Sequence, residues 1–331
     1  MANDRTFYAC QAVNIQPLIF NPATSTFGSG SFTYIHGVQS VGLNTNFDIE
    51  NIFELGQIEI YDNVLKIPSI EVTLEKVLDD HPSIYTAISS GTSLLNASKN
   101  RTNLRFGIYK DTTNAASGAS PENTLLTLEC TGMYVNSVSY TFPSDGSLTE
   151  SVTLVGNHKA WAVSGSFDPS GEGAMDGLLS IPGSVSGGID TPLTHVLNRK
   201  DVSSIVAPHG NNKVQSITLS VDLGREDLLE LGQQGPYARV PTYPVEVTAE
   251  IEYLVDEDNM EQIEFDENTS VLPEKDQSIS VGAGYYDFDL GDKCFLKSVT
   301  FGGGDATGGN ATVTYSYSTY NTFQVTYTNP D

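Results

Sequence analysis

The chain has 331 residues, of which 16 are Lys or Arg and 41 are Asp or Glu, so its formal net charge is −25. A surface this acidic repels phosphate backbones, which disfavours a protein that grips nucleic acid by releasing counterions. The length exceeds one typical domain, and no apolar run is long enough to span a membrane.

Composition predicts a strand-rich protein. Charged residues make up only 17% of the chain, while Ser, Thr, Asn, Gly and Tyr are frequent, as in extended sheets and turns. The N-terminal residues lack the basic region and apolar core of a secretory signal. Cys10, Cys130 and Cys294 are an odd number at wide spacing, and they predict neither a disulfide framework nor a metal site. We therefore expect free thiols in a protein made in a reducing cytosol.

Strands dominate the first half. An early strand at 32–47 leads through a turn-rich or helical connection to a long strand at 66–78. A short helix is predicted over 81–88, with Gly91 just past its end. Further strands are expected at 104–110, 127–143 and 150–161, with a long loop at 111–124. Trp161, at the end of the last of these strands, is expected to anchor the core or a domain junction.

The second half follows a stretch rich in Gly, Ser and Pro at 164–190, which is typical of a linker. Five strands are predicted after it, at 213–223, 243–255, 294–302, 310–318 and 322–328.

The long strand of each half has one apolar and one acidic face. Val72 and Leu74 alternate with Glu71 and Glu75 in the first half. In the second half Val247 and Ala249 alternate with Glu246, Glu250 and Glu252. We expect the apolar side chains to face a core and the glutamates to face water.

The sequence also contains an internal repeat. Residues 38–64 align without a gap with residues 214–240, and both carry the same four-residue run. The run is Glu54-Leu55-Gly56-Gln57 in the first copy and Glu230-Leu231-Gly232-Gln233 in the second. After a slip of one residue, Glu71-Val72-Thr73 aligns with Glu246-Val247-Thr248. A later match aligns 137–140 with 298–301, and Val152-Thr153 with Val313-Thr314. Duplication of a whole fold predicts pseudo-symmetry in an assembly.

Motifs that would indicate catalysis are scarce. The histidines, at 36, 81, 158, 195 and 209, have no metal-ligand spacing, and neither a phosphate-binding loop nor a nucleophile elbow occurs. Glu71 and Glu75 could imitate a glycosidase pair, but acidic strand faces are common. We expect no enzymatic activity, no metal and no cofactor.

The two related segments FDIENIFELGQIEIYDNVLKIPSIEVTLEKVL and DLGREDLLELGQQGPYARVPTYPVEVTAEIEYL resemble the tail tube (major tail) proteins of tailed bacteriophages. The resemblance covers more than half of the chain and rests on the pattern, the duplication and the acidic balance together. It implies a mainly β fold of antiparallel β-sandwich domains, each with at most a short helix. In that family the inner sheets of neighbouring subunits join into one closed barrel, and the rings stack around a lumen.

For this chain the resemblance implies two tandem tube domains, at 1–165 with an N-terminal arm and at 191–331, joined by a linker at 166–190. Three chains would form a ring with pseudo-sixfold symmetry. Glu71, Glu75, Glu246, Glu250 and Glu252 would face the lumen, and the two four-residue runs would lie at interfaces. Partners would be further copies and sheath, baseplate hub, tape measure and tail terminator proteins. DNA would pass without specific binding, in a virion tail assembled in the host cytoplasm.

Two alternatives stay open. A baseplate hub or tube-initiation protein duplicates the same fold. A two-domain carbohydrate-binding or adhesin module would need exposed aromatic platforms, for which the cluster Tyr315, Tyr317, Tyr320 and Tyr327 is a candidate.

Overall fold

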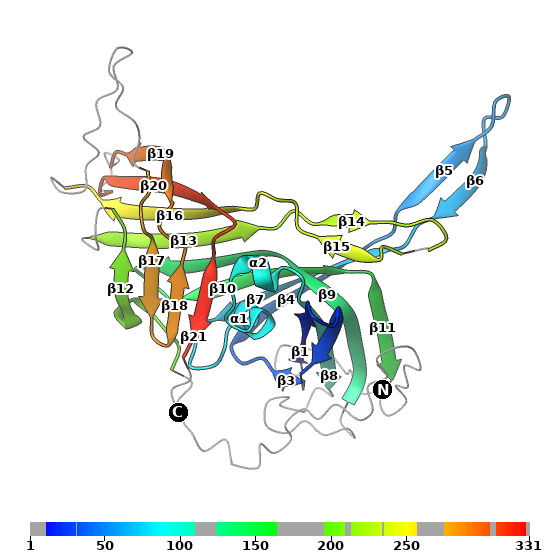
Figure 1. The fold of residues 1–331 in the computed structure, drawn as a ribbon, viewed down its shortest axis with the longest axis horizontal. Coiled ribbons are helices and arrows are strands. Elements are labelled where there is room, and N and C mark those ends of the chain that lie inside the picture. The colour runs from blue at the N-terminus through cyan, green and yellow to red at the C-terminus, as the bar shows by residue number, and fades with distance from the viewer. Residues whose placement is uncertain are drawn as a thin grey trace.

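The computed structural model describes residues 11–30, 32–109, 124–163, 195–208, 213–233, 235–256, 275–304 and 309–328. The predicted linker at 166–190 and almost all of the predicted loop at 111–124 lie outside these residues. The described chain is mainly β, with large antiparallel sheets and few helices, which confirms the predicted fold class (Figure 1). No helix within the described ranges is both long and apolar enough to cross a membrane.

An inner sheet runs through both halves of the chain in the antiparallel order β19-β20-β16-β13-β9-β10-β7-β4. Its strands are β4 (Val38–Asn46), β7 (Ser69–Val77), β9 (Thr124–Pro143), β10 (Thr149–Gly156), β13 (Val214–Asp222), β16 (Glu246–Leu254), β19 (Phe295–Gly302) and β20 (Thr312–Tyr320). Pairing of β13 with β9 joins the second half to the first.

Two outer sheets cover this inner sheet. The outer strands of the first half are β1 (Gln11–Asn21), β8 (Arg101–Tyr109), the first half of β9, and β11 (His158–Val163), with β2 (Thr26–Ser29) and β3 (Thr33–Tyr34) beside β1. Those of the second half are β12 (Val202–Val206), β17 (Ser280–Ala283), β18 (Tyr286–Asp289) and β21 (Gln324–Tyr327). Strand β9 changes partners at Gly132, whose φ of +66° is readily adopted only by glycine.

The two halves repeat one topology. The inner order β4-β7-β10-β9 recurs as β13-β16-β20-β19, and the outer order β1-β8-β9-β11 recurs as β12-β17-β18-β21. The single 20-residue strand β9 is represented in the second half by two strands, β18 and β19. The structure thus supports the duplication, while the domain boundaries at 165 and 191 stay a prediction.

A β-bulge occurs at the same place in each half, and this shows which residues of the two halves are equivalent. The equivalence corrects the alignment predicted from the sequence. The ladder shifts between Val38 and Ser40 in the first half and between Val214 and Ser216 in the second. The hydroxyl of Ser40 donates to Glu75, 35 residues away, and the hydroxyl of Ser216 donates to Glu252, 36 residues away. The second copy therefore has one residue more between these positions, where the alignment predicted one fewer.

A second pair of bulges tests the later match. Thr153 pairs with Ser137 and Ser316 pairs with Ser298, each next to a shift of the ladder. The alignment of 137–140 with 298–301 is confirmed. The alignment of Val152-Thr153 with Val313-Thr314 is wrong by two residues, because Thr153 is equivalent to Ser316.

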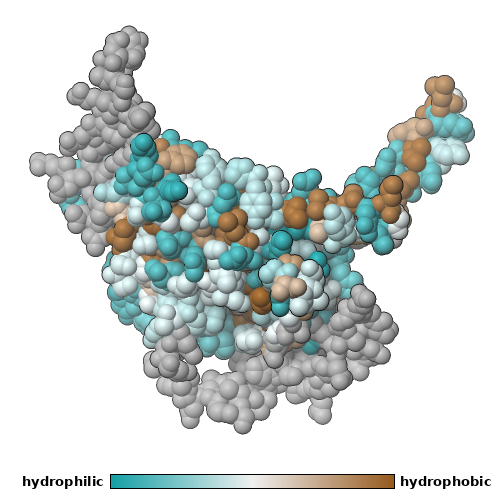
Figure 2. Space-filling model, in the orientation of Figure 1, coloured by the Kyte–Doolittle hydropathy of each residue, from teal (hydrophilic) through white to brown (hydrophobic). Residues whose placement is uncertain are grey.

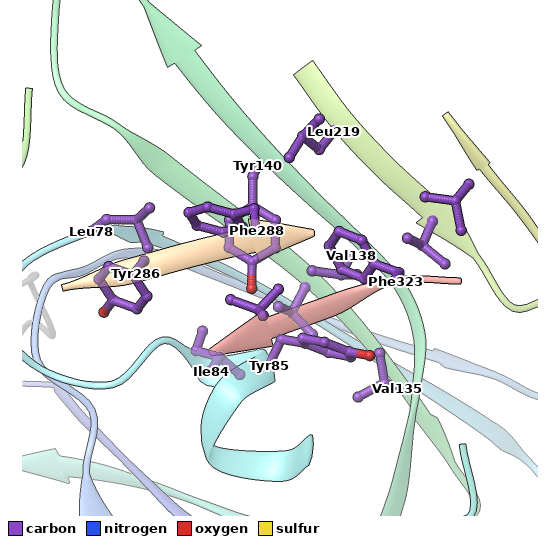
Figure 3. Close-up of a cluster of buried hydrophobic side chains, with 14 of the residues drawn as sticks. Leu78, Ile84, Tyr85, Val135, Val138, Tyr140, Leu219, Tyr286, Phe288 and Phe323 are labelled. Atoms are coloured by element: carbon purple, nitrogen blue, oxygen red, sulfur yellow. The ribbon is translucent and has the colours of Figure 1, made fainter. Parts of the chain in front are cut away.

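The core lies between the inner sheet, the outer sheets and one short helix (Figure 3). The Tyr140 ring from β9 lies 4.7 Å from Phe288 of β18, centroid to centroid. Helix α1 (Ile84–Ser89) begins where the Ser83 side chain accepts a hydrogen bond from the Thr86 amide, as a helix cap does. The predicted helix over 81–88 is therefore present but begins three residues later. A second short helix, α2 (Leu94–Ala97), and a 3₁₀ turn, η3 (Arg199–Asp201), complete the described helices.

Two β-hairpins connect the paired inner strands β4–β7 and β13–β16. The first is formed by β5 (Ile49–Phe53) and β6 (Ile60–Leu65), the second by β14 (Glu226–Leu228) and β15 (Ala238–Val240). Both extend beyond the end of the inner sheet, and the first rises away from the body of the molecule (Figure 1).

Candidate functional site: the polar sheet face and the hairpin tips

The inner sheet has one buried face and one polar face. Val72, Leu74, Val247 and Ala249 are fully buried, as the alternation predicted. The opposite face carries hydroxyl side chains at matched positions of neighbouring strands, because direct partners in a ladder point to the same side. The partners include Thr73 with Thr153, Ser139 with Ser220, Ser220 with Thr248, and Thr300 with Thr314.

The five glutamates singled out from the sequence all lie on this polar face. Glu71, Glu75 and Glu250 are exposed, while Glu246 and Glu252 are partly buried. The direct ladder partners of Glu71 are Asn44 and Val155, and those of Glu250 are Thr218 and Ser316. The sequence thus predicted correctly which face of each strand carries acid.

The glutamates of the two halves are nevertheless not equivalent in the way that the alignment predicted. Because Glu75 corresponds to Glu252, Glu71 corresponds to Thr248, and Glu250 corresponds to Thr73. The sequence match at Glu-Val-Thr misled the alignment, since a two-residue shift keeps the alternation intact. As a result, Glu71, Glu246 and Glu250 each lie at a separate level along the strands, whereas Glu75 and Glu252 share one level. Each level is about 6.6 Å from the next on the same face.

Basic side chains are scarce in the inner strands. Within these eight described strands the basic residues are Lys76 and Lys297. Lys76 is buried on the core side and forms an ion pair with Asp79 at 2.7 Å. Lys297 lies 2.6 Å from Glu246, which also accepts a hydrogen bond from Ser318. These two donors hold the pKa of Glu246 below its ordinary value.

The predicted interface runs form the tips of the two hairpins. In each, the Gln amide donates to the Glu carbonyl, from Gln57 to Glu54 at 3.2 Å and from Gln233 to Glu230 at 3.4 Å. The third residue is a glycine with φ of +97° at Gly56 and +90° at Gly232, as the third position of a type II turn requires. The leucine before each glycine, Leu55 or Leu231, is fully exposed.

More apolar side chains follow the tips along the hairpins (Figure 2). The exposed ones include Phe53, Ile58, Ile60, Tyr61, Leu65, Leu229 and Tyr237. Exposed apolar side chains gathered in this way make the hairpins a candidate contact surface.

The body of the protein has a cavity of about 740 Å³ beside α1, lined by residues from β1, β3 and β21. The His36 and His81 rings stack in its wall with centroids 3.9 Å apart. Burial lowers the pKa of His36 to about 4, and the neighbouring His81 adds to this shift. Among the described side chains no group of three or more His, Cys, Asp or Glu could hold a metal ion.

The aromatic residues do not form an exposed platform at the predicted cluster. Tyr315 and Tyr317 are fully buried, and Tyr327 is partly buried. Of the four, only Tyr320 is exposed. Trp161, expected to anchor the core or a domain junction, is 52% exposed on β11 and so is not a core residue.

Comparison with known proteins gives limited similarity. No family model matches the sequence, and no curated protein matches it. One similar solved structure is the anti-feeding prophage (AFP) baseplate, 6-fold symmetrised, at 13% identity and a TM-score of 0.35, covering 50% of this chain and 100% of that chain. Another is the AFP tube terminating cap, at 11% identity and a TM-score of 0.34, covering 49% of this chain and 94% of that chain. Both TM-scores lie below 0.5, so neither similarity defines the function of this chain.

Proposed function

We propose that this protein is a structural subunit of a phage tail tube, and that the polar face of its inner sheet lines the lumen. The observation that carries the proposal is the continuity of this face across both halves of the chain. Eight strands present hydroxyl and carboxylate side chains on one side, while the other side is closed by the core. The one basic side chain of the inner strands outside the core, Lys297, is paired with Glu246.

Such a wall would act passively. DNA carries one negative charge per ~1.7 Å of its axis, so even a weak attraction in each ring would add up along a tube to strong retention. Acidic side chains repel the duplex instead, and this repulsion is screened over ~8–10 Å at ordinary salt. Hydroxyl groups between the carboxylates keep the surface hydrated without adding positive charge. The staggered levels of Glu71, Glu250 and the Glu75/Glu252 pair would spread this repulsion along the channel.

The repeat sets the proposed stoichiometry. Each half supplies four strands of the inner sheet, so three chains would supply six equivalent units to one ring. The hairpins, the N-terminal segment 1–30 and the predicted long loops would contact the adjacent ring. Sheath, baseplate hub, tape measure and tail terminator proteins are the expected further partners, in a virion tail assembled in the host cytoplasm. The proposal requires neither catalysis nor a cofactor.

A hub or tube-initiation protein is the alternative within the same class, and copy number separates the two. Quantitative mass spectrometry of purified tails gives the number of copies of this protein per particle. We expect a copy number that corresponds to many rings of three chains. A single ring per particle would assign it to the hub, and its absence from tails would end the proposal. The binding-module alternative has lost its predicted aromatic platform, because Tyr315 and Tyr317 are buried.

A further inference from the structure

The two edge strands of the inner sheet, β4 and β19, are the repeat equivalents of two strands that already pair inside the chain. Strand β13 corresponds to β4, and β9 corresponds to β19. Their pairing, β13 with β9, joins the halves from Ser216 opposite Pro143 to Asp222 opposite Ser137. We call this β13–β9 pairing the internal joint. Equivalents of its two strands, β4 and β19, lie at the two free edges of the inner sheet.

Core-side residues are buried in the internal β13–β9 pairing, but their equivalents at the free edges are exposed, as expected if those edges lack a partner strand. On the β13 side, Ile217 and Leu223 are 1% and 2% exposed, whereas their equivalents Val41 and Phe47 are 37% and 67% exposed. On the β9 side, Tyr140 is fully buried, whereas its equivalent Phe301 is 57% exposed. Long edge strands with exposed apolar side chains are templates for further strand pairing.

The side chains that cover the internal joint come from the following repeat. Phe288 and Phe323 of the second half lie over Tyr140 of the first, with ring centroids 4.7 Å and 6.3 Å away. Phe142 also contacts Phe288, at 5.1 Å. The corresponding cover for Phe301 would have to come from the first half of another chain.

We propose that β4 of one copy pairs with β19 of the next copy in the register of the internal joint. In the internal joint Leu219 pairs with Tyr140. Their repeat equivalents are Leu43 and Phe301, so the same register places Leu43 opposite Phe301 on the core side. On the polar side it places Asn44 opposite Thr300, and Asn46 opposite Ser298. The ring closed by this joint is the ring of the proposed tube, but the joint itself depends only on the second copy and not on the passage of DNA.

The two edges differ, so the contact is head-to-tail and must either close a ring or extend as a filament. The interchain joint also differs in chemistry from the internal one. Gly302, Gly303 and Gly304 stand where the internal joint has Thr141, Phe142 and Pro143. Val41 would therefore face glycine where Ile217 faces Phe142, and less apolar area would be buried at this end. The three interchain joints are consequently the ones at which the ring separates first.

The internal joint also indicates how to trap its counterpart. Backbone hydrogen bonds from Leu223 to Asn136 and from Ser144 to Gln215, both 2.8 Å, lie at its two ends. Hydrogen-bonded and non-hydrogen-bonded residue pairs alternate along an antiparallel ladder. Starting from these two end pairs, the core-side pairs of the joint are hydrogen-bonded, and the polar-side pair Ser139–Ser220 is not. Such pairs have Cα atoms about 4.5 Å apart, within the range of a disulfide. The equivalent pair between chains is Asn44 with Thr300.

The test is oxidative cross-linking of the full chain carrying N44C and T300C, at concentrations at which it assembles. We expect covalently linked dimers and closed trimers as the main products. The matched control N44C/S298C should give only background cross-linking, because that pair would be diagonal and about 7–8 Å apart. S139C/S220C should form its disulfide within one chain and show that the chain has folded. The single-cysteine variants report any reaction with the native thiols.

Equal cross-linking of N44C/S298C would overturn the register. No interchain product from N44C/T300C, in protein whose S139C/S220C disulfide forms, would overturn the joint itself, and so would a chain that stays monomeric at high concentration. If the cross-link forms but tails contain a single ring per particle, the joint stands and the tube function fails.

Discussion

Glu150 of β10 is fully buried at the start of α1, where it accepts three hydrogen bonds. The donors are the Ile84 and Tyr85 amides, at 2.7 and 3.0 Å, and the Tyr140 hydroxyl, at 2.7 Å. This carboxylate ties the helix to the inner sheet. Glu150 is therefore part of the core, although the sequence shows only a single acidic residue in a predicted strand.

We predict that E150Q destabilises the protein although it removes a buried acid. The amide nitrogen of glutamine cannot accept a hydrogen bond, so at least one buried donor loses its partner, which costs about 1–3 kcal/mol. Y140F should cost less, since it removes one donor and leaves the carboxylate with two. Urea unfolding curves give both values, and an E150Q protein as stable as the wild type would contradict this account of the helix attachment.

The same residue has a defined pH dependence. Burial raises the pKa of Glu150 above its ordinary value of 4.5. The folded state therefore holds this proton more tightly than the unfolded state, and the contribution of Glu150 to the unfolding free energy falls as pH rises from 4.5 through the folded pKa. The difference between the wild-type and E150Q curves against pH should show this slope, and parallel curves would contradict it.

His36 has the opposite dependence. Its pKa is about 4 in the folded protein against an ordinary value of 6.5, because burial and the stacked His81 disfavour its charged form. Asp79 opposes the shift and Lys76 adds to it. The stability that depends on neutral His36 is complete above pH 6.5 and is lost as pH falls from 6.5 through 4.

H36F should keep a ring against His81 while removing this titration. We predict that its urea midpoint falls less than that of the wild type between pH 6.5 and pH 4. Equal losses in the two proteins over this range would show that His36 does not carry the effect.

At the scale of elements, the two hairpins carry exposed apolar tips at equivalent positions. The second hairpin is attached to the first half of the chain, because Arg225 donates to Val135 and Ser98. The first hairpin rises away from the body (Figure 1). If the hairpins contact the next ring, their leucines contribute to stacking but not to ring closure.

We therefore predict that L55S/L231S forms rings of normal width that do not stack into long tubes. L95S, which changes a half-exposed leucine on α2 away from the hairpin tips, should leave tube length unchanged. Negative-stain microscopy distinguishes single rings from tubes. Tubes of wild-type length from L55S/L231S would refute the role given to the tips.

The sequence predicted the inner strands because their alternation is regular and one of their faces is buried. It missed β1, whose run includes Pro17 and several partly buried positions, and it missed the four-residue strands β17 and β18. The hairpin strands were missed for another reason, since β5 and β6 are exposed at every position and show no alternation. The repeat register was also misassigned, because a shift of two residues along a strand leaves the pattern of faces unchanged.

At the scale of the whole molecule, the polar face is the surface that the proposed function uses. Glu71 and Glu250 are its exposed glutamates outside the contacts with Ser40, Ser216, Ser318 and Lys297. We predict that E71K/E250K leaves ring formation intact but slows DNA ejection, and that added salt relieves the defect. E71Q/E250Q removes the same charges without adding positive ones, and should eject DNA closer to the normal rate. Ejection by E71K/E250K at the wild-type rate in low salt would remove the electrostatic role of this face.

Three-dimensional reconstruction of the self-assembled chain by cryo-electron microscopy would show the ring, the channel and the interchain joint together. We predict a closed ring of three chains with pseudo-sixfold symmetry, in which the inner sheets form one continuous wall. Glu71, Glu75, Glu250 and Glu252 should face the channel, and β4 of each chain should lie beside β19 of the next. A ring that carries these glutamates on its outer surface, or a chain that forms no closed ring, would contradict this prediction.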